Sequence, residues 1–201
     1  DKKNFKKHIE AANEGIATAI CIGNYLATGK ISCLYLQNSG LGNAINPLSS
    51  ISHPKVYSIP ILLLIGWRGA PGEKDEPQHM VKGKITIKLL KNLNIRYCII
   101  KQKKDFLKVK KLISYSKKFK TPVACLIKKN TFLSEKKLSN QIKQNGVNRE
   151  FFIKELLSKI KNSVKIVSTT GYTSRELYQA RLEHKYKSGK DFYMVGGMGH
   201  A

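Results

Sequence analysis

The sequence has 201 residues, 41% of them hydrophobic, which is enough for one sizeable domain or for one domain and part of a second. No apolar run is long enough to cross a membrane and no secretory signal pattern opens the chain, so we expect a cytoplasmic protein with no membrane partner. The formal net charge is +24, but 32 of the 37 basic residues are lysine, spread along the chain, and the runs at 101–104 and 108–111 have no interleaved aromatic residues. Because nucleic-acid recognition favours arginine and stacking aromatics, we expect no nucleic-acid partner. A non-enzymatic basic binding module is the least favoured alternative.

Apolar segments of helical and strand type alternate along the first two thirds of the chain. In chain order the predicted elements are a helix at 11–29, a strand at 30–37, a helix at 42–52, a strand at 58–66, a helix at 77–93, a strand at 95–100, a helix at 103–119 and a strand at 121–128. Strand and helix in strict succession are typical of a parallel sheet with helices on both faces. The sequence therefore predicts an α/β fold.

The alternation restarts after a polar stretch at 129–148, which we interpret as a linker. A helix is predicted at 149–160, a strand at 164–170, a further helix from 174, and a strand at 191–195. We therefore expect a first unit at 1–128, a linker and helix at 129–160, and a second unit at 161–201 that is only begun. The chain does not start with methionine and ends in the glycine-rich GGMGHA, so we expect a piece of a longer protein.

The four cysteines are Cys21, Cys33, Cys98 and Cys125, and all stand in apolar runs. None forms a C-x-x-C pair or has the spacing of a zinc site. Their surroundings predict four buried free thiols in a reducing compartment.

Two stretches near the start of the chain carry chemical groups in unusual places. AANEG, at 11–15, puts Glu14 at the start of an apolar helix, where partial removal from water favours the protonated carboxyl. A first-turn glutamate that serves the helix dipole is the structural alternative. QNSGLGNAINPL, at 37–48, has glycines one residue apart, but it lacks the Lys-Ser/Thr of a nucleotide phosphate loop and the third glycine of a dinucleotide turn.

Three further stretches each follow a predicted strand. The first, GWRGAPGEKDEPQH at 66–79, gathers the only tryptophan with Arg68, Asp75, Gln78 and His79. Ligands of parallel sheets bind beyond the carboxyl ends of the strands, so this loop is favoured as part of a site. The other two are STTGYTSREL at 168–177 and GGMGHA at 196–201, for which ordinary turns are the structural alternative.

Together these five stretches resemble the thiamine-diphosphate-dependent decarboxylases, and among them those that act on phosphonopyruvate. The resemblance runs in order from about residue 9 to 201 and is weak only across 101–160. It implies two thiamine-diphosphate-binding-fold units with parallel sheets, a pyrimidine-binding one at 1–128 and the start of a diphosphate-binding one at 161–201. It also implies decarboxylation of 3-phosphonopyruvate to phosphonoacetaldehyde and CO2 in phosphonate biosynthesis.

The resemblance also implies roles for individual residues. Glu14 corresponds to the glutamate that activates the aminopyrimidine of the cofactor and is the expected catalytic residue. The other residues expected to bind thiamine diphosphate are Gly40, Leu41, Gly42, Asn43, Thr170, Gly171, Gly197, Met198 and Gly199. Because phosphonopyruvate is a small anionic 2-keto acid, we expect cationic and amide donors to bind it. The candidates are Arg68, Gln78, His79 and His200.

The acidic-glycine motif by which the family holds Mg²⁺ and the diphosphate does not occur in the sequence. We therefore assign no metal ligand, expect the ligands beyond residue 201, and expect this piece alone to be inactive. In the family the two kinds of domain meet between subunits, which implies a homo-oligomer with the site at the interface.

Three related alternatives stay open. Sulfopyruvate decarboxylase performs the same chemistry on a sulfonate, although some of its forms carry the two domains on separate chains. An acetolactate-synthase relative would need a third, central domain, which this sequence lacks between its units. A degenerate remnant of such an enzyme is the last alternative.

Overall fold

The chain divides into two compact units, residues 1–133 and 134–201. The computed structural model describes residues 8–132, 146–161, 163–183 and 191–194. Among these residues no helix is both long and apolar enough to cross a membrane.

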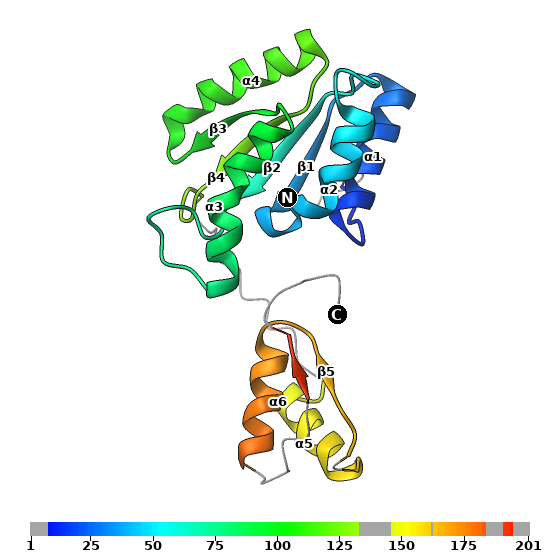
Figure 1. Ribbon diagram of the computed structural model, residues 1–201, viewed down its shortest axis with the longest axis vertical. Helices are drawn as coiled ribbons and strands as arrows, with labels where there is room; N and C mark the ends of the chain where they lie inside the picture. Colours follow the sequence, from blue (N-terminus) through cyan, green and yellow to red (C-terminus); the bar gives the residue numbers. More distant parts are fainter. Residues whose placement is uncertain (1–7, 133–145, 162, 184–190, 195–201) are drawn as a thin grey trace. The chain divides into compact units, whose positions relative to one another are not determined.

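A four-stranded parallel sheet forms the centre of the first unit, with the strands in the order β1-β2-β4-β3 (Figure 1). The strands are β1 (Ser32–Gln37), β2 (Ile61–Gly66), β3 (Arg96–Ile100) and β4 (Val123–Ile127). The helices between them are α1 (Glu14–Thr28), η2 (Asn38–Gly40), α2 (Leu41–Pro47), η3 (Leu48–Ser52), α3 (Pro77–Asn92), η4 (Lys103–Asp105) and α4 (Phe106–Phe119). The predicted α/β succession and the parallel sheet are confirmed.

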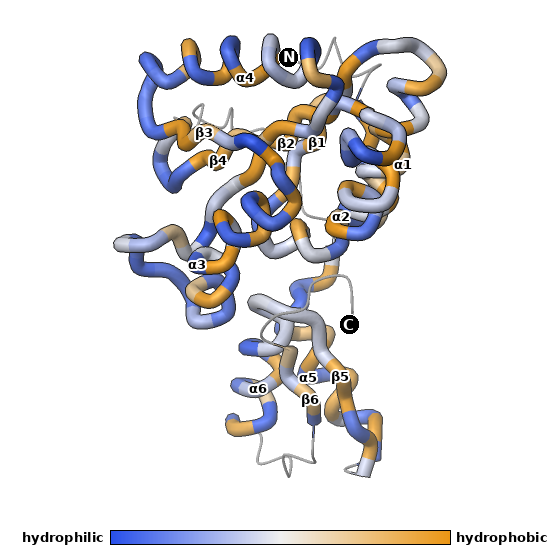
Figure 2. The backbone as a smooth tube through the Cα atoms, turned by 45° about the horizontal axis from the view of Figure 1, so that its top comes forward, coloured by the Kyte–Doolittle hydropathy of each residue, from blue (hydrophilic) through white to orange (hydrophobic). Residues whose placement is uncertain are grey.

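Helices cover the two faces of this sheet unequally. A large core cluster joins α1, α2 and α3 to one face, whereas a smaller cluster joins only α4 to the other, above β3 and β4. Every residue of β4 is buried, because this strand lies between helices on both sides. Strand β1 alternates between buried and exposed residues, and Tyr35 on its outer face is 74% exposed. Figure 2 shows the apolar strands and, by contrast, the alternating polar and apolar residues of α4.

Helix α1 ends as predicted but begins at Glu14, three residues after the predicted start at residue 11, because Asn13 caps it. The Asn13 side chain accepts a hydrogen bond from the backbone N–H of Ile16 at 2.9 Å and so caps the amino end. Gly29 ends the helix with a left-handed φ of 69°, and its N–H donates to the carbonyl of Tyr25. Glu14 is thereby fixed as the first residue of the helix.

All four cysteines are free, as predicted, but they are not all buried. Cys21 and Cys125 are buried and Cys98 is partly exposed, whereas Cys33 is exposed. The prediction was wrong for Cys33 because β1 is an edge strand whose outer face α4 does not cover.

The second unit contains α5 (Arg149–Lys159), β5 (Val167–Ser168), α6 (Tyr172–Glu183) and β6 (Phe192–Tyr193). Ile153 and Leu157 of α5 pack against Leu177 and Ala180 of α6, so the helix at 149–159 shares a core with the second unit. The two strands pair in parallel as expected, but each has only two residues and is shorter than the predicted runs at 164–170 and 191–195.

A buried ion pair joins α6 to the strands of the second unit. Arg181 Nε lies 2.8 Å from Asp191 Oδ2, and both side chains are almost completely removed from water. The same carboxylate accepts the backbone N–H of Ile166 at 3.0 Å. A pair of this kind persists in a core because further hydrogen bonds satisfy both partners.

A carboxylate also fixes the start of α4. Asp105 is 4% exposed, and its Oδ2 accepts the backbone N–H groups of Lys101 and Gln102 at 3.0 and 3.2 Å. Its Oδ1 lies 2.7 Å from Lys108 Nζ. The ammonium group of Lys108 and the two N–H donors lower the pKa of Asp105 from 3.8 to about 2.

We expect the thiols to react with a maleimide in an order set by their exposure. Cys33 reacts first because it is exposed, Cys98 reacts more slowly, and Cys21 and Cys125 react only on unfolding. Mass spectrometry of the partly labelled chain measures this order, and Cys33→Ser serves as the control that removes the fast phase. Rapid labelling of Cys125 in the folded chain would contradict the arrangement of β4.

We expect Asp105 to stabilise the first unit above pH 4 and to lose this effect as the pH falls toward 2. The folded pKa lies below the unfolded one, so protonation at low pH favours the unfolded state. Urea unfolding at several pH values should therefore show that Asp105→Asn is less stable than the wild type at pH 7 and that the difference shrinks toward pH 2. A difference that is constant with pH would show that the charge of Asp105 has no such role.

Candidate active site

Glu14 lies against the turn that contains the two glycines. Its Oε2 accepts a hydrogen bond from Asn43 Nδ2 at 2.9 Å, which ties the start of α1 to α2. Among the described residues no partner binds its Oε1. The side chain is half-buried at a helix amino terminus, where the helix dipole favours a negative charge.

Gly40 is required because the side chain of Glu14 occupies the space beside it. A Cβ atom on Gly40 would lie only 2.0 Å from Glu14 Oε1, although the φ of −86° is one that any residue adopts. A Cβ on Gly42, by contrast, would meet no atom within 4 Å. Leu41 between them is completely buried in the core. One glycine of the pair thus makes room for Glu14, and the other leaves open space.

Asn38 connects this turn to the loop after β2. Its Nδ2 donates to the carbonyl of Arg68 at 2.9 Å and to Thr86 Oγ1 at 3.0 Å, and its Oδ1 accepts the N–H of Arg68 at 3.1 Å. The side chain is 4% exposed and fully hydrogen-bonded. The ends of β1 and β2 are therefore held together, and the turn at Gly40 and the loop at Arg68 are neighbours.

Arg68 and Asp75 form a bidentate ion pair within that loop. Arg68 Nε donates to Asp75 Oδ2 at 2.7 Å, and Nη2 donates to Oδ1. The N–H groups of Gly69 and Glu76 also donate to this carboxylate, at 2.8 and 2.9 Å. Hydrogen bonding from Arg68, with help from these N–H groups, holds the pKa of Asp75 well below its usual range. The guanidinium group is thus locked in place with Nη1 left over.

The two predicted residues at the start of α3 lie beside this loop. Gly69, at a φ of +64°, packs so closely on α3 that a Cβ there would lie 2.0 Å from the carbonyl oxygen of His79. Burial, together with the positive charge of Arg68, lowers the pKa of His79. Its Nδ1 is buried and has no hydrogen-bond partner among the residues that the structure describes. Gln78 is half-buried next to it.

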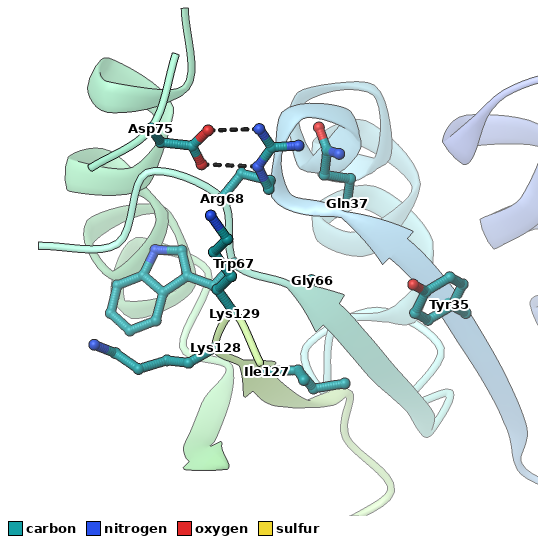
Figure 3. A pocket seen from close by; sticks show the side chains of 9 residues that line it. All are labelled: Tyr35, Gln37, Gly66, Trp67, Arg68, Asp75, Ile127, Lys128 and Lys129. Atoms are coloured by element: carbon teal, nitrogen blue, oxygen red, sulfur yellow. Dashed lines mark hydrogen bonds and ion pairs between the residues drawn. The ribbon is translucent and has the colours of Figure 1, made fainter. Parts of the chain in front are cut away.

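A cavity of about 450 Å³ opens at the carboxyl ends of β1, β2 and β4 (Figure 3). Its volume suits a small molecule. The residues that line it are Tyr35, Gln37, Gly66, Trp67, Arg68, Asp75, Ile127, Lys128 and Lys129. Of the predicted substrate residues, the cavity contains Arg68 but neither Gln78 nor His79.

Gln37, Lys128 and Lys129 line the cavity although none of them was among the predicted site residues. The available signal was that Lys128 and Lys129 directly follow a buried strand, as Arg68 does. What could not be read from the sequence is that β4 lies beside β2, so that the two strand ends meet.

The predicted residues of the second unit lie at the end of β5. Gly171 has a φ of +98°, which favours glycine, and Thr170 beside it is half-buried just before α6. Ser174, in the first turn of α6, donates to the carbonyl of Thr169 at 2.6 Å and thereby holds the turn. The described residues contain no group of three or more His, Cys, Asp or Glu side chains that could hold a metal. Gly197, Met198, Gly199 and His200 lie outside the described residues.

Comparison with known proteins gives two groups of relatives, while no protein-family model matches the chain. A phosphonopyruvate decarboxylase of Streptomyces viridochromogenes is 32% identical over 215 residues, covering 97% of this chain and 51% of the relative. Another, from Streptomyces hygroscopicus, is 30% identical over 213 residues with the same coverage of 97% and 51%. The alpha subunit of sulfopyruvate decarboxylase from Methanococcus maripaludis is 38% identical over 128 residues, or 63% of this chain and 74% of the subunit.

The extent of these matches shows to which family the chain belongs. It spans about half the length of the phosphonopyruvate decarboxylases, but nearly all of its own residues take part in the match. It covers 74% of the sulfopyruvate decarboxylase subunit at 38% identity. The relatives agree with the resemblance carried by the five sequence stretches, and the chain belongs to the family of phosphonopyruvate and sulfopyruvate decarboxylases.

Proposed function

We propose that the whole protein decarboxylates 3-phosphonopyruvate to phosphonoacetaldehyde and CO2 with thiamine diphosphate as cofactor. The observation that carries the proposal is the position of Glu14, whose carboxyl packs on Gly40 and binds Asn43. The names of the relatives that match 97% of the chain support the substrate.

The surroundings of Glu14 fit an aminopyrimidine ring. Oε2 is already held by Asn43, so the carboxyl has one defined orientation, and Oε1 has no partner among the described residues. The turn at Gly40 leaves this carboxyl packed against backbone without a side chain between them. When bound, thiamine diphosphate supplies a cationic ring that accepts the electrons released as CO2 leaves. Glu14 would share a proton with the pyrimidine nitrogen N1′, while the hydrogen bond from Asn43 holds its carboxyl in place.

The substrate is a small keto acid with an anionic group at its far end. Arg68 supports this assignment, because Asp75 occupies only the Nε and Nη2 side of its guanidinium group. The remaining donors at Nη1 are available for a phosphonate or a carboxylate.

The remaining roles are proposed from the resemblance. Thr170 and Gly171 lie at the end of β5 and would hold the diphosphate of the cofactor. Mg²⁺, with its ligands expected beyond residue 201, would balance the charge of that diphosphate. The protein acts in the cytoplasm as a homo-oligomer, and its product feeds phosphonate biosynthesis.

Sulfopyruvate is the second candidate substrate. The observation in its favour is the identity of 38% with the alpha subunit of a sulfopyruvate decarboxylase, higher than the 32% with a phosphonopyruvate decarboxylase. An assay of the full-length protein with both keto acids, following CO2 release, decides between them.

We expect Glu14→Gln to slow hydrogen–deuterium exchange at the reactive carbon of bound thiamine diphosphate by at least about a hundredfold, because the side chain loses its transferable proton. Glutamine retains the shape and the hydrogen bond with Asn43, so the fold should be unchanged by circular dichroism. Glu10→Gln, a change at an exposed residue just before the helix, is the matched control. Near-normal exchange in the Glu14 variant would remove this residue from catalysis.

We expect Arg68→Ala to raise KM for the keto acid about 10- to 100-fold, since a charge-assisted hydrogen bond contributes about 1.5–3 kcal/mol. The affinity for thiamine diphosphate should change far less. Arg96→Ala, an exposed arginine at the amino end of β3 and thus at the opposite edge of the sheet, is the control. If KM stays at the wild-type value, Arg68 does not bind the substrate.

A further inference from the structure

We infer that Lys129, together with Gln37 and the free edge of Arg68, forms a subsite for the tetrahedral anionic group of the substrate, a phosphonate or a sulfonate. This inference rests on the proposed function for the rest of the substrate. It adds two residues from strand ends that the sequence did not connect with Arg68.

The register of the sheet brings the three residues to one place. Gln37 of β1 pairs with Gly66 of β2, and Gly66 pairs with Ile127 of β4. The three strands therefore end at the same level. The N–H of Trp67 donates to the carbonyl of Ile127 at 2.8 Å and continues this alignment beyond the sheet. Arg68 and Lys129 each follow a strand end by two residues, and both line the cavity there.

Lys129 provides the charge that is not neutralised. Of the three cations that line the cavity, Arg68 is paired with Asp75 and Lys128 is paired with Glu73 at 2.9 Å. Among the described residues no carboxylate lies within ion-pair distance of Lys129. The cavity therefore keeps one unbalanced positive charge next to an arginine, an arrangement that an incoming anion relieves.

The directions of the side chains agree with this assignment. Figure 3 shows Lys128 extending along the indole ring of Trp67, whereas the side chain of Lys129 points toward Arg68. The ammonium group of Lys128 lies 5.9 Å from the centre of that ring. Lys128 thus belongs to the wall of the cavity, and Lys129 is free to contact a ligand.

Gln37 and Arg68 each keep a free N–H donor. Ser39 Oγ donates to Gln37 Oε1 at 2.7 Å, so the carbonyl oxygen of this amide is occupied and Nε2 is left. Asp75 occupies Nε and Nη2 of Arg68 and leaves Nη1. With the ammonium group of Lys129, three neighbouring strand ends offer N–H donors to one cavity. A tetrahedral group with three oxygen acceptors matches such a set, whereas a neutral or cationic ligand does not.

The subsite can be tested by ligand binding without turnover. Phosphonoacetate and sulfoacetate carry the two end groups but no keto group, so they bind without reacting. We expect the 201-residue chain to bind at least one of them with saturation in NMR titrations, with shifts at Gln37, Arg68 and Lys129. The ligand that binds more tightly identifies the end group.

Lys129→Gln should weaken this binding about 10- to 100-fold, the loss expected for one charge-assisted contact. Lys110→Gln removes an exposed lysine of α4 with the same change in net charge and should bind as the wild type does. Equal affinity of the two variants, or no saturable binding of either anion, would overturn the subsite.

A failure of the subsite can be distinguished from a failure of the proposed reaction. In the full-length protein, Glu14→Gln should abolish decarboxylation yet bind the chosen anion with wild-type affinity, whereas Lys129→Gln should raise KM. If the wild type decarboxylates neither keto acid but binds the anion through Lys129, the reaction assignment fails while the subsite stands. If it decarboxylates a keto acid with a KM that Lys129→Gln leaves unchanged, the reaction stands and the subsite fails.

Discussion

The side chain of Asn38 lies almost completely buried between the end of β1 and the loop that follows β2, and it uses its carbonyl and its amide group there. It binds the N–H and the carbonyl of Arg68, as a paired strand would, and it also reaches Thr86 in α3. Two residues later in the chain stands Gly40, against which Glu14 packs. One amide therefore holds the residue proposed to bind the substrate beside the turn on which Glu14 packs. A buried amide with every polar atom satisfied is a rigid connection, because breaking any one bond leaves an unpaired group in the core.

The charge of Asp75 in the candidate site is likewise satisfied by several hydrogen bonds. Asp75 binds the guanidinium group of Arg68 and two backbone N–H groups, so its negative charge is fully used within the loop. Burial, together with the charge of Arg68, lowers the pKa of His79 and so disfavours a further positive charge beside Arg68. The cavity therefore keeps free nitrogen donors on Gln37, Arg68 and Lys129. The proposed preference for an anionic substrate rests on these local groups rather than on the large positive charge of the chain as a whole.

The names of the relatives agree with a subsite that recognises the end group of the substrate. Both groups of relatives are decarboxylases of three-carbon keto acids by name, and their names differ in the end group, phosphonate or sulfonate. A subsite that recognises three acceptor oxygens on one atom would serve either group. Discrimination between them would then depend on charge, since a phosphonate can carry a second negative charge that a sulfonate cannot. Lys129 is the residue of the cavity whose charge is available for that purpose.

Much of the fold could be predicted from the sequence because helices and strands follow local rules. The period of the apolar residues located α1 within the predicted helix at 11–29, and the apolar run at 58–66 located β2. Glu14, the glycine turn and Arg68 were recognised as candidates because each stands beside a predicted strand or helix end. The lengths of the two strands of the second unit were overestimated, since a run of apolar residues does not reveal where a partner strand stops pairing.

What the sequence by itself determined was therefore the kind and order of the elements, the position of Glu14 at a helix start, and the family to which its motifs point. The tertiary structure decided which strand ends meet. The order β1-β2-β4-β3 places β4 beside β2 and so brings Lys129 to Arg68, although 60 residues separate them in the chain. It also left Cys33 exposed on an edge strand and showed that Gly40 makes room for a side chain. The physical reason is that strand order, helix coverage and close packing depend on contacts between distant residues, which no local period of the sequence encodes.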